Sequence, residues 1–184
     1  MIKVLVAVDV QNDFITGSLH NDAAIKVVPN VVARVNALDG DVIYATKDTH
    51  SENYLDTAEG KKLPFVHCVK GTEGWELHPD VQAALNAAVV RGIDVCYVEK
   101  PTFGSYDLVD LLKEDMEYYD DTDLDVEFIG FCTDICVVSN VLLVKAAFYE
   151  NAKVSVDPTC CAGVSPETHE AALLTMKSCQ VDGV

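Results

Sequence analysis

Cys136 is the residue of this sequence best placed to act as a nucleophile, and it lies in the stretch Val126–Val144 (VEFIGFCTDICVVSNVLLV). An apolar run there ends at Gly130, the good helix N-cap types Thr133 and Asp134 follow, and a long apolar segment comes next. The pattern predicts a strand, a tight turn and a helix capped by Asp134. The first helical turn lowers the pKa of a thiol and favours thiolate. The alternative is a buried structural cysteine.

Two further reactive residues are predicted at strand ends, Asp9 at the end of the apolar run 2–9 and Lys100 after the run 93–99. Ligands of parallel α/β sheets bind beyond the carboxyl ends of the strands, so we expect both residues to lie near Cys136. Taken singly, Asp9 is equally suited to capping a turn and Lys100 to a solvated position. Together with Cys136 they favour a catalytic group.

The chemistry expected of this group is acyl transfer. Asp9 would take the proton of Cys136, and Lys100 would hold the two acidic groups together. The backbone N–H of Cys136, with one from the Phe131–Cys132 turn, would form an oxyanion hole. Attack on an amide would release ammonia and leave a thioester, which water would hydrolyse.

The elements that would position these residues alternate between strand and helix, which predicts an α/β fold: a doubly wound, mostly parallel sheet of five to six strands with helices on both faces. The spacing over 24–38 is helical but contains Pro29, so we expect the regular helix to start there. The tail after the last helix is expected to add the sixth strand. The predicted strands are 2–9, 41–46, 93–99, the run before Gly130 and 153–156, and the other predicted helices are 79–90, 106–114, the segment after Asp134 and 166–178.

Composition limits the possible functions. A chain of 184 residues with 49% hydrophobic residues predicts a single domain, 1–184. A net charge of −17 argues against nucleic acid and anionic membrane as partners. The apolar start MIKVLVAVDV is too short for a signal peptide or a span, which predicts a cytoplasmic protein. Seven irregularly spaced cysteines predict free thiols rather than a disulfide framework.

The long polar segment 47–78 contains candidate metal ligands. Asp48 and His50 are two residues apart, and His67 follows on the far side of the segment. One carboxylate and two imidazoles suit zinc, iron or manganese with positions left open for water or substrate. The D-x-H pattern is weak by itself, because loop histidines are commonly just solvated.

Aromatic residues in the predicted loops are candidates for binding a flat substrate ring. Phe14 follows Asp9, Phe103 and Tyr106 follow Lys100, and Phe131 precedes the predicted oxyanion turn. Each of them is also suited to an ordinary position in the core. For Tyr106, on a predicted helix face, this interpretation is as strong as substrate binding.

Three motifs together, VDVQNDF, EKPTFGS and GFCTDICV, resemble the isochorismatase-like cysteine hydrolases and, within that family, the nicotinamidases. The resemblance covers nearly the whole chain. It implies that Asp9 is the acid, Lys100 the lysine and Cys136 the nucleophile, with a cis peptide bond at Phe131–Cys132. Cys132 departs from the small residue, commonly alanine, of the family, and a second thiol there invites oxidative pairing with Cys136.

The resemblance also implies a metal and a substrate. Nicotinamidases carry Asp-x-His and a later histidine, matched by Asp48, His50 and His67, and some add a glutamate, for which Glu59 is suitably placed. The metal, zinc above iron or manganese, would contact the pyridine nitrogen of nicotinamide. The expected products are nicotinate and ammonia. Relatives of this family often form homo-oligomers.

Other functions stay open from the sequence. One is a related amidohydrolase that acts on a carbamoyl or small aliphatic amide. Another is a non-catalytic thiol protein using Cys132 and Cys136, which would leave the placement of Asp9 and Lys100 unexplained. A nucleotide-binding flavodoxin-like module is disfavoured because the chain has no G-x-G-x-x-G motif or phosphate-binding loop.

Overall fold

The computed structural model describes all residues from Met1 to Val184 and has one five-stranded sheet in the order β3-β2-β1-β4-β5. Every neighbouring pair of strands is parallel. The strands are β1 (Ile2–Val8), β2 (Val42–Asp48), β3 (Asp94–Lys100), β4 (Leu124–Phe131) and β5 (Ala152–Ala162). The helices are α1 (Asp22–Asn36), α2 (Pro79–Val90), α3 (Tyr106–Tyr118), α4 (Val138–Phe148) and α5 (Pro166–Ser178).

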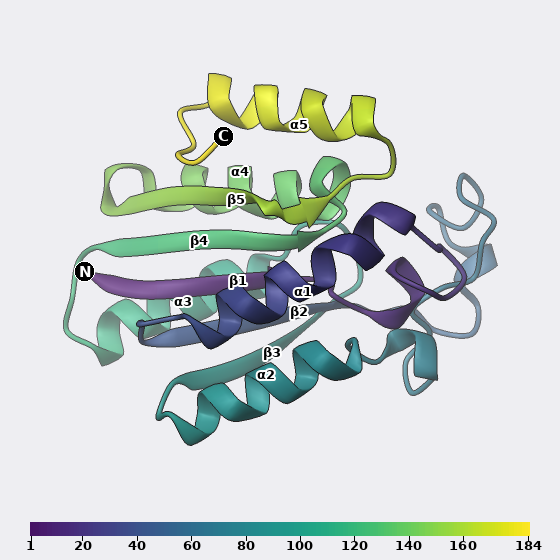
Figure 1. Cartoon of the computed structure of the whole chain (residues 1–184). Helices are drawn as coiled ribbons and strands as arrows, with labels where there is room; N and C mark the ends of the chain where they lie inside the picture. The colour runs from purple at the N-terminus through teal and green to yellow at the C-terminus, as the bar shows by residue number, and fades with distance from the viewer.

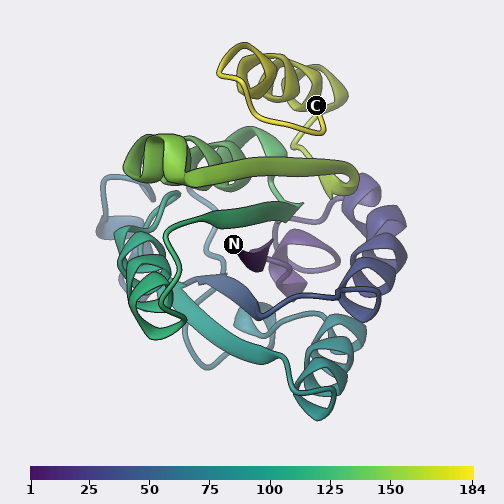
Figure 2. The same cartoon turned by 90° about the vertical axis from the view of Figure 1, so that its left-hand side faces the viewer.

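Helices cover both faces of the sheet (Figure 2), which confirms the doubly wound fold. Helices α1 and α2 pack on one face, and α3 and α4 pack on the other. The alternation along β1 explains the two layers, because Val4 and Val6 belong to one apolar cluster and Leu5 and Ala7 to the other. Helix α5 lies beyond β5, at the edge of the sheet (Figure 1).

The strand order reverses between β1 and β4, and the loops at their carboxyl ends gather on one side of the molecule (Figure 1). From β1 the chain moves outward through β2 to β3, then returns to β4 on the opposite side of β1. The long segment between β2 and α2 lies at this same end (Figure 1). A switch point of this kind is where open α/β sheets bind ligands.

Helix α1 begins before the proline from which we expected it to start. Asn21 caps it, because its side chain accepts hydrogen bonds from the N–H groups of Ala23 and Ala24. Pro29 therefore lies inside the helix. A proline removes one backbone donor from a helix. The buried side chains of Ala24 and Val28 hold the turns before Pro29 in the core.

Three other predicted features differ in the structure. The segment 159–162, expected to be loop, is the end of β5, because Cys161 pairs with Gly130 after a register shift in β4. The tail makes an isolated parallel bridge between Asp182 and Ser155 rather than a sixth strand. Helix α3 also continues to Tyr118, beyond the expected end at residue 114.

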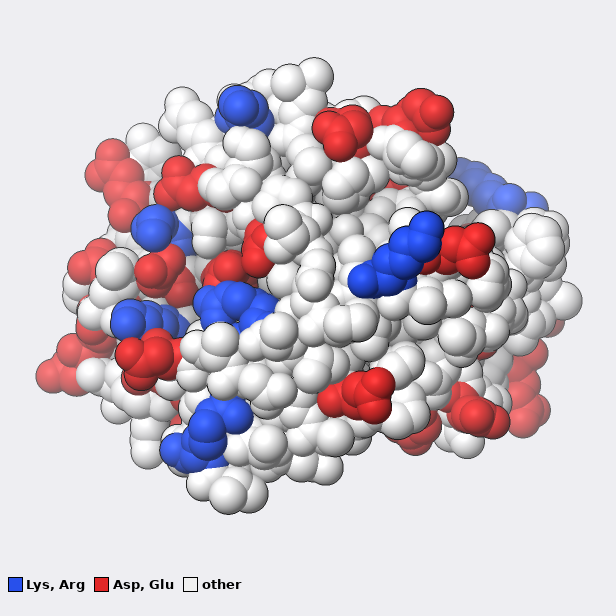
Figure 3. Space-filling view, viewed as in Figure 1, with Lys and Arg blue, Asp and Glu red and all other residues white.

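The chain carries many more carboxylates than cations, 30 Asp and Glu against 13 Lys and Arg. In Figure 3 the basic side chains are scattered among acidic ones and form no continuous basic patch on the face shown. No helix has both the length and the apolar character needed to cross a membrane.

Candidate active site

Asp9, Lys100 and Cys136 meet at the carboxyl end of the sheet. Asp9 directly follows β1, Lys100 ends β3, and Cys136 belongs to the helical turn Thr133–Val137 after β4. The Lys100 Nζ lies 2.6 Å from Asp9 Oδ2 and 3.5 Å from Cys136 Sγ. All three side chains are buried. The expected convergence of the three residues is therefore present.

The carboxyl group of Asp9 is held so that one oxygen stays available as a proton acceptor. Thr46 Oγ1 donates to Asp9 Oδ1 over 2.6 Å. Oδ2 makes no hydrogen bond of ordinary geometry, although Lys100 Nζ is its ion-pair partner. Burial raises the pKa of Asp9, and the opposing charge of Lys100 does not fully cancel the increase. A carboxylate in this state is suited to act as a general base.

The thiol of Cys136 does not have the low pKa expected from its helical turn. Burial and the neighbouring Asp9 carboxylate raise the pKa of Cys136 well above its ordinary value, and Lys100 lowers it only in part. The helix end is outweighed because the thiol is removed from solvent beside a negative charge. The resting form is thus a neutral thiol, and a nucleophilic role requires a base, for which the neighbouring Asp9 carboxylate is suited.

The turn that carries Cys136 is not capped by Asp134. Cys132 occupies the cap position, its carbonyl accepts a hydrogen bond from Val137 N–H, and the turn is of π type. The Asp134 side chain instead accepts from the N–H of Val164 at 3.0 Å and from the Thr168 hydroxyl. Asp134 therefore ties the nucleophile turn to the start of α5, a long-range contact that cap preferences do not reveal.

The peptide bond between Phe131 and Cys132 is cis, as the family resemblance implied. The backbone N–H of Cys132 donates no hydrogen bond within the chain. It is available, next to Cys136, to stabilise a developing oxyanion.

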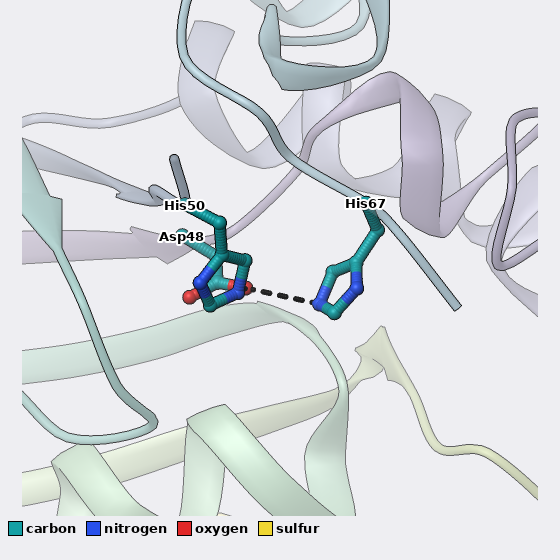
Figure 4. A group of neighbouring side chains, drawn as sticks. All are labelled: Asp48, His50 and His67. Atoms are coloured by element: carbon teal, nitrogen blue, oxygen red, sulfur yellow. Dashed lines mark hydrogen bonds and ion pairs between the residues drawn. The ribbon is translucent and has the colours of Figure 1, made fainter. Parts of the chain in front are cut away.

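Asp48, His50 and His67 form a second buried group (Figure 4). It lies beside the first, because Lys100 Nζ is 3.4 Å from Asp48 Oδ1. The Asp48 Oδ2 lies 2.9 Å from His50 Nε2 and 3.4 Å from His67 Nε2. His67 Nδ1 lies 2.8 Å from the Phe65 carbonyl, which can only accept, so Nδ1 is the donor. In the metal-free protein a proton on His67 Nε2 joins the ring to the Asp48 carboxylate. A metal ion held by these atoms would take the place of that proton.

The donor set fits a divalent metal. The candidate ligand atoms of Asp48, His50 and His67 all lie within 4.8 Å of one another. Glu59 Oε1 is 3.7 Å from His50 Nε2 and 3.9 Å from His67 Nε2, so it can supply a further oxygen. Burial raises the pKa of Asp48, but hydrogen bonds to both histidines and the charge of Lys100 lower it well below its ordinary value, so the carboxylate is ionised. Nitrogen and oxygen ligands of this kind suit zinc, iron or manganese.

One cavity of about 710 Å³ joins the two groups. Cys132 and Cys136 line it together with Asp48, Glu59 and His67. The cavity can therefore present one small molecule to the thiol and to the metal ligands at once.

Two of the four expected aromatic residues line this cavity, Phe14 and Phe103. Tyr106 begins α3 and points to solvent with 76% of its surface exposed. Phe131 is buried in the core on the α1 and α2 side of the sheet. Neither Tyr106 nor Phe131 is placed to contact a molecule in the cavity.

Some site residues escaped the sequence reasoning. Phe65, Ile135 and Val164 line the cavity, and Thr46 bonds Asp9 from within β2. Phe65 and Ile135 could have been identified from the sequence, because they lie within two residues of His67 and Cys136. Thr46 had no such signal, because a threonine in an apolar strand is an ordinary strand residue.

Known proteins match this chain over almost its full length. The profile of the isochorismatase domain family matches residues 3–182. A nicotinamidase/pyrazinamidase of Mycobacterium tuberculosis is 28% identical over 200 residues, covering 98% of this chain and 97% of that protein.

Solved structures agree in fold. The nicotinamidase/pyrazinamidase of Bacillus subtilis is 26% identical with a TM-score of 0.78, covering 96% of this chain and 95% of that one. A pyrazinamidase of Pyrococcus horikoshii in complex with zinc is 25% identical with a TM-score of 0.73, covering 97% and 96%.

Proposed function

This chain belongs to the isochorismatase domain family, and we propose that it hydrolyses the exocyclic amide of nicotinamide to nicotinate and ammonia. The observation that carries the proposal is that one cavity joins the buried Cys136 to the metal-ligand group Asp48 and His67. A thiol nucleophile and a site for a ring nitrogen are the two features that a pyridine carboxamide requires.

In the first half of the reaction Asp9 takes the proton of Cys136, and Sγ attacks the amide carbon. Lys100 Nζ lies 2.6 Å from Asp9 and 3.5 Å from the sulfur. Its charge stabilises the Asp9 carboxylate before the proton transfer and the Cys136 thiolate after it. The N–H groups of Cys132 and Cys136 stabilise the oxyanion. Asp9 then returns the proton to the leaving nitrogen, the C–N bond breaks, and ammonia leaves a thioester.

In the second half Asp9 accepts a proton from water, which attacks the thioester carbon. The C–S bond breaks, the sulfur regains its proton, and the carboxylic acid product is released. Both halves need the same base and the same oxyanion donors, which explains why a single buried group serves the whole cycle.

Asp48, His50 and His67, with Glu59 as a further oxygen ligand, would hold a divalent metal, which we take to be zinc. When bound, this metal supplies a Lewis acid for the ring nitrogen of the substrate. Phe14 and Phe103 in the cavity wall offer apolar faces for the ring itself.

The test is ammonia release from nicotinamide by the purified, zinc-loaded protein, beside Cys136→Ala and a chelator-treated sample. We expect turnover to be lost in both controls. Turnover that survives chelation but not Cys136→Ala would retain the thiol mechanism and remove the metal role. A folded, zinc-loaded protein that leaves nicotinamide intact would point to another small amide or carbamoyl substrate. The single domain, a homo-oligomer and a cytoplasmic location stay predictions.

A further inference from the structure

The side chain of Gln11 is wholly buried beneath the metal-ligand group and bonds only to backbone. Its Oε1 accepts from the N–H of Asp48 at 2.7 Å, and its Nε2 donates to the carbonyl of the same residue at 2.9 Å. Nε2 also donates to the carbonyl of Trp75 at 2.9 Å. One primary amide thus satisfies both backbone groups of a candidate metal ligand.

The Gln11 side chain makes the hydrogen bonds to the backbone of Asp48 that β1 would make if the strand continued. β1 pairs with β2 as far as Val8 and Thr46, and Asp9 N–H still bonds the Thr46 carbonyl. Beyond that the chain of β1 turns away, while β2 continues to Asp48. Unpaired backbone groups of a buried strand end are unfavourable, and the Gln11 amide has the same donor and acceptor as a peptide group. It continues the hydrogen-bond ladder by one residue and so fixes Asp48.

Asp13 holds the other end of the metal-ligand group from the same loop. Its Oδ2 accepts from the N–H of Cys68 at 2.8 Å, directly after His67, and its Oδ1 accepts from the N–H of Ser18 at 3.0 Å. A Cβ at Gly74 would overlap the Asp13 carboxylate, so glycine is what lets the carboxylate approach that backbone.

We propose that Gln11 and Asp13 are positioning residues of the metal centre. Gln11 sets the place of the Asp48 carboxylate, and Asp13 sets the place of the His67 imidazole, each through the backbone. Neither side chain acts on substrate, because Gln11 and Asp13 are absent from the cavity lining. The inference rests on the metal-binding part of the proposed function. Partners that orient metal ligands typically change metal affinity by about 10- to 100-fold when they are removed.

The experiment measures the zinc Kd of metal-free protein by competition with a chromogenic chelator, so it needs no substrate. Gln11→Met keeps the length of the side chain but removes its three hydrogen bonds. We expect its zinc Kd to rise by about 10- to 100-fold. Asp13→Asn, which keeps one acceptor oxygen, should raise the Kd less. Gln11→Leu, which also removes all three hydrogen bonds with an apolar side chain of similar volume, serves if Gln11→Met does not fold.

Tyr44→Phe is the matched control. It removes a hydrogen bond of 2.6 Å from the Tyr44 hydroxyl to Asp115 in the same strand, β2, away from the metal-ligand group. It should lower the Tm of the metal-free protein and leave the zinc Kd unchanged. Excess zinc should restore the turnover of Gln11→Met, because Gln11 acts only through the occupancy of the site.

The proposal is overturned if the folded Gln11 and Asp13 variants bind zinc as tightly as the unsubstituted protein. It is also overturned if Tyr44→Phe weakens zinc binding as much as they do, since the effect would then be general destabilisation, or if the unsubstituted protein binds no zinc. Weaker zinc binding by the variants, in a protein that does not hydrolyse nicotinamide, would uphold the positioning role and reject the proposed substrate.

Discussion

Lys100 Nζ lies 2.6 Å from Asp9 Oδ2, and neither side chain is exposed to solvent. The two residues come from strands separated by β2, so the lysine side chain crosses the end of β2 to reach the carboxylate. The same Nζ lies 3.4 Å from Asp48 Oδ1. A single ammonium group therefore joins the carboxylate of the proposed base to the metal-ligand group.

Removing the charge of Lys100 should be costly for both stability and activity. Lys100→Met leaves the Asp9 charge buried without its partner, which should lower the free energy of unfolding by about 3–5 kcal/mol. Turnover should fall on the order of 10²-fold or more, because the base is then protonated or displaced. Urea denaturation and ammonia release measure the two effects.

Lys113→Met is the control for that substitution, since its exposed pair with Asp110 should contribute at most about 1 kcal/mol. The double variant Asp9→Asn/Lys100→Met should regain part of the lost stability but no activity. Equal destabilisation by Lys100→Met and Lys113→Met would contradict the buried-pair argument.

Cys132 should contribute to catalysis through its backbone and not through its thiol. Burial raises the pKa of Cys132 to about 12, so its side chain is a neutral thiol at neutral pH. Cys132→Ala keeps the N–H group, and we expect kcat/KM near that of the unsubstituted protein. Cys136→Ala should lose on the order of 10⁴-fold or more. Steady-state kinetics compare the two, and a large loss in Cys132→Ala would show that the second thiol takes part.

The sequence was sufficient to predict the elements that position the catalytic group. The apolar runs that became β1, β3 and β4 are long enough to be recognised as buried parallel strands. Asp9 directly follows β1, Lys100 ends β3, and Cys136 lies in the turn after β4. The parallel topology then implies that Asp9, Lys100 and Cys136 share one edge of the sheet. The D-x-H spacing and His67 likewise sufficed to propose the metal ligands, once the family resemblance was added.

What could not be predicted depends on contacts between segments distant in sequence. The end of β5 pairs with β4 only after a register shift at Phe128 to Gly130, which no local pattern encodes. Asp134 has a good cap side chain but binds Val164, 30 residues away. The pKa of Cys136 follows from burial beside Asp9 and not from its place in a helical turn. Tertiary surroundings decided each of these cases.

The pH dependence of stability should reveal the hydrogen bonds that Asp157 accepts from Thr159. Burial raises the pKa of Asp157, but hydrogen bonds from Thr159 outweigh this and lower it below its ordinary value. A depressed pKa in the folded state adds stability above the unfolded pKa of about 4, and this is lost as the pH falls through the folded pKa. Asp157→Asn should therefore lower the Tm by about 2–4 °C at pH 7.

That difference in Tm should shrink as the pH falls from 5 toward 3, which thermal unfolding at a series of pH values will measure. Asp56→Asn, at an exposed carboxylate that accepts no hydrogen bond, is the control for the substitution itself. A Tm difference between Asp157→Asn and the unsubstituted protein that stays constant down to pH 3 would show that the charge of Asp157 is not what stabilises the fold.

Phe103 and Tyr106, three residues apart, should differ in their effect on substrate binding. Phe103 lines the cavity, with 42% of its surface exposed, whereas Tyr106 points to solvent from the start of α3. An aromatic ring packed against a substrate ring contributes about 0.5–1.5 kcal/mol, so Phe103→Ala should raise KM roughly 2- to 10-fold with little change in kcat. Tyr106→Ala should leave both constants unchanged, because alanine is also well suited to a helix.

Michaelis–Menten measurements on nicotinamide compare the two variants. If the two substitutions raise KM equally, Tyr106 reaches the substrate, and the wall of the cavity differs from the one described here.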